Sequence, residues 1–582
     1  MTSLPPGIIL IFGALLLPFL PSVLRKVGLV GLPVLSFAHL WMFPEGYTWQ
    51  MQLFGEYTLT PIRVDALSLV WGYVFHLAAF ISAIYALHVK SATQHVSALM
   101  YAGAAIAAVF AGDFISLFVA WELTAITSVF LIWTNPTEQA YRTGMRYLII
   151  QVGSGVLLLA GVLLYYQSSG SIVFDQLAGK TVHGDVVSSL WDAGIGVQLI
   201  LLAFGIKAAF PFLHNWLQDS YPQATVTGTV WLSAFTTKLA IYALARSFGG
   251  LELLIPIGVA MTLFPIFFAV IENDLRRVLA YSLNNQLGYM VVGVGIGTEL
   301  SLNGTASHAF AHILYKGLLF MAMGAVLHRV GTIKASELGG LYKSMPLTAV
   351  FCIIGSLSIS GFPGFSGFVS KSMILTAGAE AHLYVVSLLL LVASAGVVDH
   401  SGIKIPFFAF FAHDSGKRVK EAPWNMLVAM GIAAAFCIGI GVYPDALYEI
   451  LPYSHEATEY RHHVFSSDHI WFSLQLLLFA ALAFVIMMKT GIYPPEIRSV
   501  NLDTDWVYRK AIPAFGKHVI HPPLALLGAG WKGVMGWRDQ FLEKVGRIHG
   551  PSGPLGNPWT TGSTTMWAAV LLALYLLLYY LT

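Results

Sequence analysis

Long apolar runs recur along the whole sequence and limit what the chain can become. A helix that crosses a membrane needs about 20 apolar residues, and windows of that size locate about sixteen candidates. We therefore expect an all-α polytopic membrane protein with about 14–16 transmembrane helices. The candidate helices start near Gly7, Gly28, Ala66, His95, Phe114, Arg146, Val197, Ala224, Leu253, Val278, Thr305, Leu347, Tyr384, Met426, Ile470 and Thr564.

The composition excludes several other classes of protein. Only 10% of the 582 residues are charged, whereas soluble domains carry about 25%. The 31 basic residues nearly balance the 29 acidic ones, so no basic excess would attract nucleic acid. Two cysteines make neither a disulfide framework nor a metal cage. Nucleotide, haem and zinc motifs are absent from the sequence, so we expect no cofactor, no metal and no catalytic site in this chain.

The placement of Lys and Arg predicts the orientation in the membrane. Connections on the cytoplasmic side carry an excess of these residues. Here they gather in every second connection, which predicts that both termini lie outside a cell membrane, and we expect a bacterial inner membrane. The odd-numbered connections hold Arg25, Lys26, Lys90, Arg142, Arg146, Arg276, Arg277, Arg329, Lys334, Lys343, Lys417, Arg418 and Lys420, whereas the even-numbered ones hold Arg63, Lys180 and Arg246.

Ionisable residues inside the apolar runs are the candidate functional groups. A charge in hydrocarbon costs a few kcal/mol, so each one needs a partner, water or a function. Glu122, Lys207 and Lys238 each stand between apolar residues. Pro211 cannot donate to the carbonyl oxygen of Lys207, so we expect the helix to break there. Pairing that serves only packing is the alternative for each single charge.

Two histidines and a lysine form a row in the eleventh run. His308, His312 and Lys316 are four residues apart and share one helix face. At 1.5 Å per residue the row covers about 12 Å. Imidazoles accept and donate protons near neutral pH, so the row predicts a proton relay bridged by water. A polar stripe that joins two helices is the alternative.

The twelfth run contains a second helix breaker. Gly361, Pro363, Gly364 and Gly367 interrupt it, and Lys371 follows. A broken helix in each half is typical of inverted repeats in transporters. Asp399, His400 and Lys404 lie toward the cytoplasmic end of the next run, where they form either the exit of the relay or an ordinary helix end.

The polar segment 489–562 is rich in proline. Its longest proline-free stretch, Leu524–Gly550, alternates aromatic and basic residues. This pattern is typical of an amphipathic helix on the cytoplasmic face, and a surface loop is the alternative. The prolines exclude one long helix across the segment, so we expect a shorter or jointed one.

These motifs resemble the antiporter-like proton-channel family of Mrp antiporters, respiratory complex I and membrane-bound hydrogenases. The resemblance implies two inverted five-helix repeats, 96–250 and 251–415, broken at spans 7 and 12. It also implies flanking helices at 1–95 and 416–488, the cytoplasmic segment 489–562 and a last span at 563–582. The matching stretches are Trp121-Glu122, Lys207 to Leu217, Asp274 to Ser282, His308 to Phe320, Leu338 to Pro346 and Ser370-Lys371.

The resemblance assigns roles to particular residues. It implies that Glu122, Lys207, Lys238, Lys316 and Lys371 carry protons. Pro211 and His214, in the stretch after Lys207, and Pro363, in the second break, would support them.

The subfamily and the function follow as expectations. Thr236 to Arg246 and Asn501 to Lys510 look like the D-type subunit of Mrp antiporters, whereas the tail looks more like the largest antiporter-like subunit of complex I. We expect a proton-translocating subunit of a hetero-oligomeric antiporter, with Na⁺ as the counter-ion and other membrane subunits as partners. The alternatives are a pump driven by a redox or hydrogenase module on other chains, and a membrane subunit for inorganic-carbon uptake.

Overall fold

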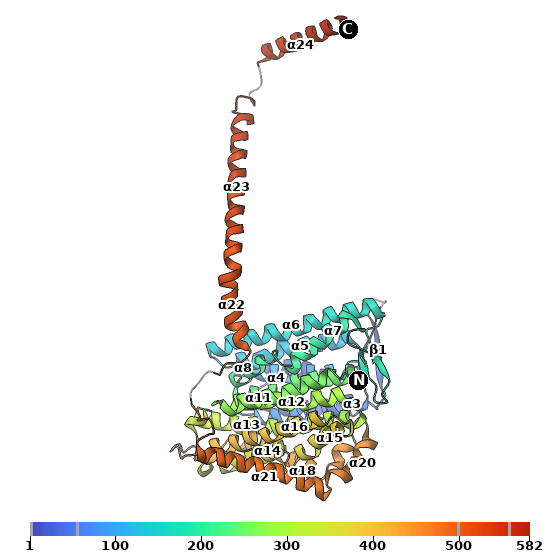
Figure 1. Ribbon diagram of the computed structural model, residues 1–582, viewed down its shortest axis with the longest axis vertical. Coiled ribbons are helices and arrows are strands. Elements are labelled where there is room, and N and C mark those ends of the chain that lie inside the picture. Colours follow the sequence, from blue (N-terminus) through green and yellow to red (C-terminus); the bar gives the residue numbers. More distant parts are fainter. Residues whose placement is uncertain (1–3, 54–56, 498–500, 557–559, 582) are drawn as a thin grey trace. The chain divides into compact units, whose positions relative to one another are not determined.

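The computed structural model describes residues 4–53, 57–497, 501–556 and 560–581. Contacts divide the chain into two units, Met1–Asn501 and Leu502–Thr582, which are described separately below. About 75% of the residues are helical. In Figure 1 the helices of the first unit run in nearly the same direction, and the predicted all-α class is confirmed.

The chain begins with three helices and a hairpin. Asp65 caps α3 reciprocally with Ser68, because its side chain accepts from the backbone N–H of Ser68 while the Ser68 hydroxyl lies 2.9 Å from the N–H of Asp65. The elements are α1 (Ile8–Leu16) with the 3₁₀ turn η1 (Leu17–Phe19), α2 (Ser22–Leu40), the antiparallel strands β1 (Thr48–Leu53) and β2 (Tyr57–Arg63), and α3 (Ala66–Tyr85).

The next group of helices contains the first predicted break. Helix α7 ends at Ala208, and Ala209 then adopts a left-handed conformation with φ 62°. The group comprises α4 (Ala92–Phe110), α5 (Phe114–Trp133), α6 (Glu138–Ser169), the short strands β3 (Gly179–Lys180) and β4 (Val186–Ser188), α7 (Gly194–Ala208), α8 (Asn215–Gln223), α9 (Val226–Ala234) and α10 (Thr236–Ser247).

A third group contains the second predicted break, where Gly361 takes φ 75° after α14. Its helices are α11 (Leu254–Ile271), α12 (Leu275–Ile296), α13 (Glu299–Val330), α14 (Pro346–Ser360), α15 (Ser366–Glu380) and α16 (Tyr384–Val397). Helix α16 continues without interruption through the π-helical turn η4 (Val398–Ile403), α17 (Lys404–Pro406) and the π-helical turn η5 (Phe407–Phe411).

These two groups repeat several details. Asp113 caps α5 and Asp274 caps α12, each by accepting from two backbone N–H groups. Helices α6 and α13 are both 32 residues long and end at a left-handed glycine, Gly170 and Gly331. Each capping aspartate also forms an isolated antiparallel bridge with a residue just beyond that long helix. The two groups therefore share their aspartate caps, their long helices and their isolated bridges.

Four more helices complete the first unit. They are α18 (Trp424–Val442), α19 (Asp445–Tyr448), α20 (Ser454–Val464) and α21 (Ser467–Thr490). Helix α13, which carries the histidine row, packs against α12, α14, α15 and α18, and from Leu300 to Val326 every residue is buried. The predicted relay residues of α13 therefore lie in the centre of the bundle.

In the second unit one expectation was wrong. The stretch from Asp505 to His549 is helical throughout, although Pro513, Pro522 and Pro523 were expected to exclude a long helix. Each proline site begins a new α-helical segment, where its missing N–H is tolerated. A π-helical turn precedes each segment: η6 (Val507–Ala511) before α22 (Ile512–Phe515), and η7 (Gly516–Ile520) before α23 (His521–His549). The last helix is α24 (Thr561–Leu581).

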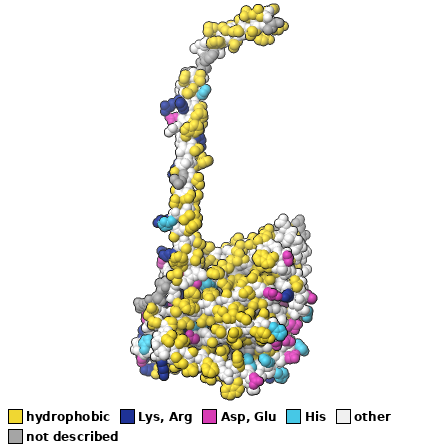
Figure 2. Space-filling view, in the orientation of Figure 1, with side chains coloured by type: hydrophobic (Ala, Val, Ile, Leu, Met, Phe, Trp, Pro, Cys, Tyr) yellow, Lys and Arg dark blue, Asp and Glu magenta, His cyan; other side chains and the backbone are white. Residues whose placement is uncertain are grey.

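The described chain contains eleven helices long and apolar enough to cross a membrane, and three shorter apolar ones. Each of the sixteen predicted starts lies within a helix or within three residues of one. Helix α12 is not counted among these eleven helices, because its buried residues Asn284, Asn285 and Gln286 lower its mean hydropathy. In Figure 2 hydrophobic side chains cover the middle of the visible face of the bundle, while charged and histidine side chains gather toward its two ends. The chain is a polytopic membrane protein.

Candidate functional site

Lys207 lies on the last turn of α7, where the helix breaks beside α5. Its fully buried Nζ atom donates to the carbonyl oxygen of Trp121 at 2.8 Å and to Oγ1 of Thr124 at 2.9 Å. The same atom lies 4.2 Å from the centroid of the Trp121 ring. Glu122 and Lys207 interact electrostatically, but no ion pair within 4 Å joins them in the described chain. The backbone of α5 therefore holds Lys207 one residue from Glu122.

Glu122 lies against α6 at a position without a side chain. A Cβ atom on Gly155 would stand 1.4 Å from Oε1 of Glu122. Oε1 is buried and has no hydrogen-bond partner among the described residues. Buried polar atoms are normally paired with protein or water, so the carboxylate is placed to bind water.

The predicted break after Lys207 has the expected form. Ala209 and Phe212 both take positive φ, on either side of Pro211. The indole N–H of Trp216 donates to the carbonyl oxygen of Ile206 at 2.9 Å, which satisfies one carbonyl freed near the helix end. His214 is buried, with its ring centroid 4.5 Å from that of Phe264. Pro211 and His214 thus belong to the structure of the break itself.

Lys238 lies near the start of α10 at another irregular point. It is fully buried, and its Nζ atom donates to the carbonyl oxygen of Ser233 at 2.7 Å. Its charge interacts with both His308 and His312. Lys238 therefore lies within electrostatic reach of the row on α13.

The α13 row is brought together as predicted. His308, His312 and Lys316 are all 0% exposed, and the two imidazoles stack with centroids 6.2 Å apart. Nδ1 of His308 lies 3.1 Å from Oγ of Ser370. Both ring nitrogens of His312 lack a partner among the described residues. Both ring nitrogens of His312 can therefore form hydrogen bonds with water.

Lys371 follows the second break. Its Nζ atom donates to the carbonyl oxygen of Ile359 at 3.1 Å, a carbonyl freed at the end of α14, and approaches Oγ of Ser394 at 3.4 Å. Pro363 lies in the link between α14 and α15. Lys371 also lines a cavity of about 220 Å³ between α15, α16 and α21, with Ser372 and His469 among its other lining residues. The cavity gives the amine space for water.

A chain of hydrogen bonds runs from Lys316 to the last predicted cluster. Lys316 Nζ donates to Ser282 Oγ at 2.8 Å, and Ser401 Oγ donates to the same oxygen at 2.7 Å. Nδ1 of His400 lies 2.8 Å from Ser401 Oγ. Asp399 and His400 belong to the π-helical turn η4, and such turns often mark functional positions. The sequence did not indicate that Ser282 and Ser401 would join the two groups.

Lys404, the third residue of the predicted cluster with Asp399 and His400, is also fully buried. Its Nζ atom donates to the carbonyl oxygens of Ala269, Val270 and Glu272 at the end of α11, and lies 2.8 Å from Oε1 of Glu496. Sequence reasoning missed Glu496, because it stands in the polar segment after α21 rather than in an apolar run. The described residues contain no cluster of three or more His, Cys, Asp or Glu side chains that could hold a metal ion.

Comparisons with known proteins agree with the resemblance seen in the motifs. Residues 111–396 match the family described as NADH:quinone oxidoreductase/Mrp antiporter, TM. The D-type subunit of the Na(+)/H(+) antiporter of Alkalihalophilus pseudofirmus is 31% identical over 312 residues, which cover 52% of this chain and 62% of that protein. Hydrogenase-4 component B of Escherichia coli is 26% identical over 434 residues, 66% of this chain and 63% of the relative. The chain thus spans less than two thirds of each relative.

Solved structures share the fold. A chain in the structure of the Mrp complex from Dietzia sp. superimposes with a TM-score of 0.68 over 82% of this chain and 98% of that one, at 21% sequence identity. The motifs, the broken helices and the family match therefore agree. Residues 111–396, about half of the chain, match that family, and they hold Glu122, Lys207, Lys238, the α13 row and Lys371.

Proposed function

We propose that the chain is a proton-translocating subunit of a multisubunit monovalent-cation/proton antiporter, with Na⁺ as the counter-ion. One observation carries the proposal. Lys207, Lys238, Lys316 and Lys371 are at most 4% exposed, and in the described chain each is hydrogen-bonded to carbonyl or hydroxyl oxygens rather than to a carboxylate. Burial disfavours the charged form of an amine, so a buried lysine held by neutral oxygens and water exchanges its proton more readily than an exposed one.

The proposed route follows the order of these groups. Protons pass from Glu122 and Lys207 through Lys238 to His312, His308 and Lys316, and they reach Lys371 along the same axis. Asp399, His400 and Lys404 form an exit branch, supported by the hydroxyl chain from Lys316 to His400. Pro211, His214 and Pro363 support the two breaks.

The proposal includes the architecture around the route. Segments 96–250 and 251–415 are inverted repeats, flanked by helices in 1–95 and 416–488, by the cytoplasmic segment 489–562 and by a last span at 563–582. The matching aspartate caps and 32-residue helices support the repeats. Both termini lie outside a bacterial inner membrane, and the partners are other membrane subunits, as the multisubunit complexes of the relatives suggest.

A second candidate is a pump in which a redox or hydrogenase module on other chains drives the same route. The similarity to hydrogenase-4 component B favours it. The proteins that co-purify with the chain separate the two candidates, because iron–sulfur subunits support the pump and small membrane subunits alone support the antiporter.

The test uses the whole complex in everted membrane vesicles. Proton movement is followed with a pH-sensitive dye after Na⁺ or K⁺ is added, and assembly is followed by co-purification of the partner subunits. We expect Glu122→Gln to lower the rate by about tenfold or more, since a positioned proton-transfer group contributes about 10²–10⁴-fold. Lys316→Arg should also lose proton transport, because the guanidinium group does not release its proton. Parental rates in both assembled variants would contradict the relay.

A further inference from the structure

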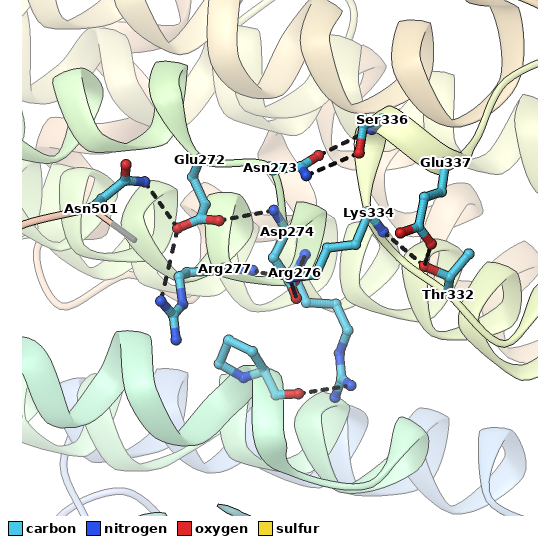
Figure 3. Close-up of polar contacts among 11 residues, drawn as sticks. Glu272, Asn273, Asp274, Arg276, Arg277, Thr332, Lys334, Ser336, Glu337 and Asn501 are labelled. Atoms are coloured by element: carbon cyan, nitrogen blue, oxygen red, sulfur yellow. Dashed lines mark hydrogen bonds and ion pairs between the residues drawn. The ribbon is translucent and has the colours of Figure 1, made fainter. Parts of the chain in front are cut away.

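The segment that follows α21 returns to the end of α11. Residues 491–497 and Asn501 belong to the first unit, and both parts reach the connection between α11 and α12. There Oε2 of Glu272 accepts a hydrogen bond from Nδ2 of Asn501 at 3.3 Å, and its Oε1 accepts one from the backbone N–H of Asp274 at 2.9 Å. Figure 3 shows these contacts, with Arg277 approaching the same Oε2 atom of Glu272 as Asn501. The segment is therefore joined to the bundle at the connection between α11 and α12, next to the basic residues Arg276 and Arg277.

Among the described residues of this segment, Glu496 and Tyr493 are the two whose side chains are buried. The Glu496 side chain is 6% exposed and lies 2.8 Å from the fully buried Nζ of Lys404. Lys404 is held at the same time by three backbone carbonyl oxygens at the end of α11. The negative end of the α11 dipole also favours a cation at that point. The amine is thus fixed between a helix end and one carboxylate.

Several buried polar atoms in and around this pair have no hydrogen-bond partner. Among the described residues these are Nε2 of His400, Oδ1 of Asp399, the hydroxyl of Tyr493 and both carboxylate oxygens of Glu496, whose contact with Lys404 is an ion pair without a hydrogen bond. Asp399, Tyr493 and Glu496 interact electrostatically with one another or with Lys404. Buried polar groups without protein partners usually bind ordered water. The space between His400 and Glu496 is therefore expected to be hydrated.

This hydrated group is continuous with the centre of the bundle. Ser282 and Ser401 connect Lys316 to His400 by hydrogen bonds of 2.7–2.8 Å. The same irregular helix, within one or two turns, carries His400, Asp399 and Lys404. Glu496, the ion-pair partner of Lys404, is the last group in this sequence of contacts. All these contacts lie within the first unit of the structure.

We propose that Glu496 is the terminal proton acceptor of the exit branch on the inner side of the membrane, and that it takes its proton from Lys404. The inference rests on the proposed function. The N–H bond of the Lys404 ammonium breaks as the O–H bond on Glu496 forms, which leaves a neutral amine and a neutral acid. Glu496 then releases the proton to cytoplasmic water, and the next proton from His400 restores the ammonium.

The surroundings of Glu496 allow both of its states. Burial raises the pKa of the Glu496 carboxyl, the Lys404 ammonium lowers it, and the neighbouring Glu272 raises it again. The groups that face Glu496 are thus Lys404 from α17, Asp399 from η4, Glu272 after α11 and Tyr493 from its own segment. The chain neighbours of Glu496, Pro495 and Ile497, are exposed, so its buried carboxylate lies near solvent.

A fixed clamp between the segment and the bundle is the competing role. Lys404→Arg distinguishes the two, because arginine preserves the positive charge and the ion pair but does not release a proton. Glu496→Gln preserves the shape and removes the proton acceptor. Glu337→Gln is the matched control, since Glu337 lies in a connection at the same end of the bundle and accepts a hydrogen bond from Thr332 of that connection.

The experiment compares these variants in the whole complex in everted vesicles, where the inner side faces the medium. We expect Lys404→Arg and Glu496→Gln to lower proton transport about tenfold with all partner subunits retained, and Glu337→Gln to transport normally. Added formate, a small proton carrier, should restore a measurable part of the rate in Glu496→Gln. Normal transport by Lys404→Arg would overturn the proposal, as would a loss in Glu496→Gln that formate leaves unchanged.

The Glu122→Gln variant separates this inference from the proposed function. If it stops transport while Glu496→Gln and Lys404→Arg remain normal, only the exit assignment is wrong. If all three transport normally, the relay itself is wrong.

Discussion

The carboxylate of Glu122 lies directly over Gly155, at a distance that leaves no room for a Cβ atom. The pair joins α5 to α6 at the level where Lys207 bonds to the backbone of α5. Gly155 thus leaves the space that the Glu122 carboxylate occupies, and the position of Glu122 depends on it.

Replacing Gly155 with alanine should displace the Glu122 carboxylate and slow proton transport severalfold. Gly153→Ala is the matched control, because Gly153 lies on the same helix with nothing within 4 Å of the added methyl group. Alanine in a helix is favoured over glycine by about 1 kcal/mol, so Gly153→Ala should keep full transport and gain thermal stability. Equal transport by the two variants would show that Glu122 needs no space there.

Removing the hydroxyl of Ser282 should interrupt the exit branch. Ser282→Ala leaves Lys316 without its 2.8 Å acceptor and removes the acceptor of the Ser401 hydroxyl, so we expect transport to fall several-fold and Ser282→Thr to retain more of it. Ser307→Ala is the control, since that hydroxyl bonds to the carbonyl oxygen of Gly304 and to Sδ of Met373, neither of which belongs to the branch. The rates are measured in everted vesicles, and a normal rate in Ser282→Ala would argue against the branch.

Loss of the Thr124 hydroxyl should impair the function of Lys207, whereas loss of the hydroxyl of its neighbour Thr127 should not. Thr124→Val removes the hydroxyl 2.9 Å from the buried Nζ, and leaving such a group under-satisfied costs about 1–3 kcal/mol. We expect slower transport and a lower thermal midpoint in detergent, with Thr124→Ser close to the parent. Thr127→Val loses only a bond to the carbonyl oxygen of Leu123. If the two valine variants behave alike, Lys207 does not depend on Thr124.

The Asp65 ion pair predicts a loss of stability in acid. Burial raises the pKa of the Asp65 carboxyl. The Arg246 guanidinium, 2.8 Å away, the backbone N–H of Ser68 and Arg63 together lower it more, so the pKa lies below its usual value. The stabilisation is therefore complete above about pH 4, the ordinary value for aspartate, and is lost as the pH falls through the lower folded value.

Variants of Asp65 separate the ion pair from the helix cap. Asparagine is a good cap, so Asp65→Asn should lose only the ion pair and its acid dependence. Asp65→Ala should cost a further amount of about 1 kcal/mol, typical of a lost cap. Thermal unfolding in detergent at several pH values measures both effects, with Asp185→Asn in an exposed turn as the control. An unchanged acid profile in Asp65→Asn would exclude the pair as its source.

Sequence periodicity and helix-breaking residues predicted much of the fold. The positions of the spans follow from the length of apolar runs, and the break after Lys207 follows from Pro211. The histidine row follows from four-residue spacing on one helix, which is a local property. These features depend on neighbours in sequence, so a single chain reveals them.

Other features depend on contacts between distant residues. Ser282 and Ser401 are 119 positions apart, and serines are common in apolar helices, so nothing local indicated their contact. Glu496 lies outside the apolar runs, where a buried carboxylate gives no signal. The long helix through Pro513 and Pro522 depends on π-helical turns that open the backbone before each proline segment. A pattern of residue types does not encode that adjustment.

The π-helical turn η4, just before Lys404, makes this stretch of the helix that begins with α16 sensitive to insertions and deletions. A turn of this kind corresponds to one extra residue in an α-helix, and one residue rotates everything after it by about 100°. The insertion therefore sets the direction in which the Lys404 side chain leaves its helix. Deleting a single residue between Val398 and Ile403 would turn the amine away from the end of α11, so this stretch should accept substitutions far more readily than changes of length.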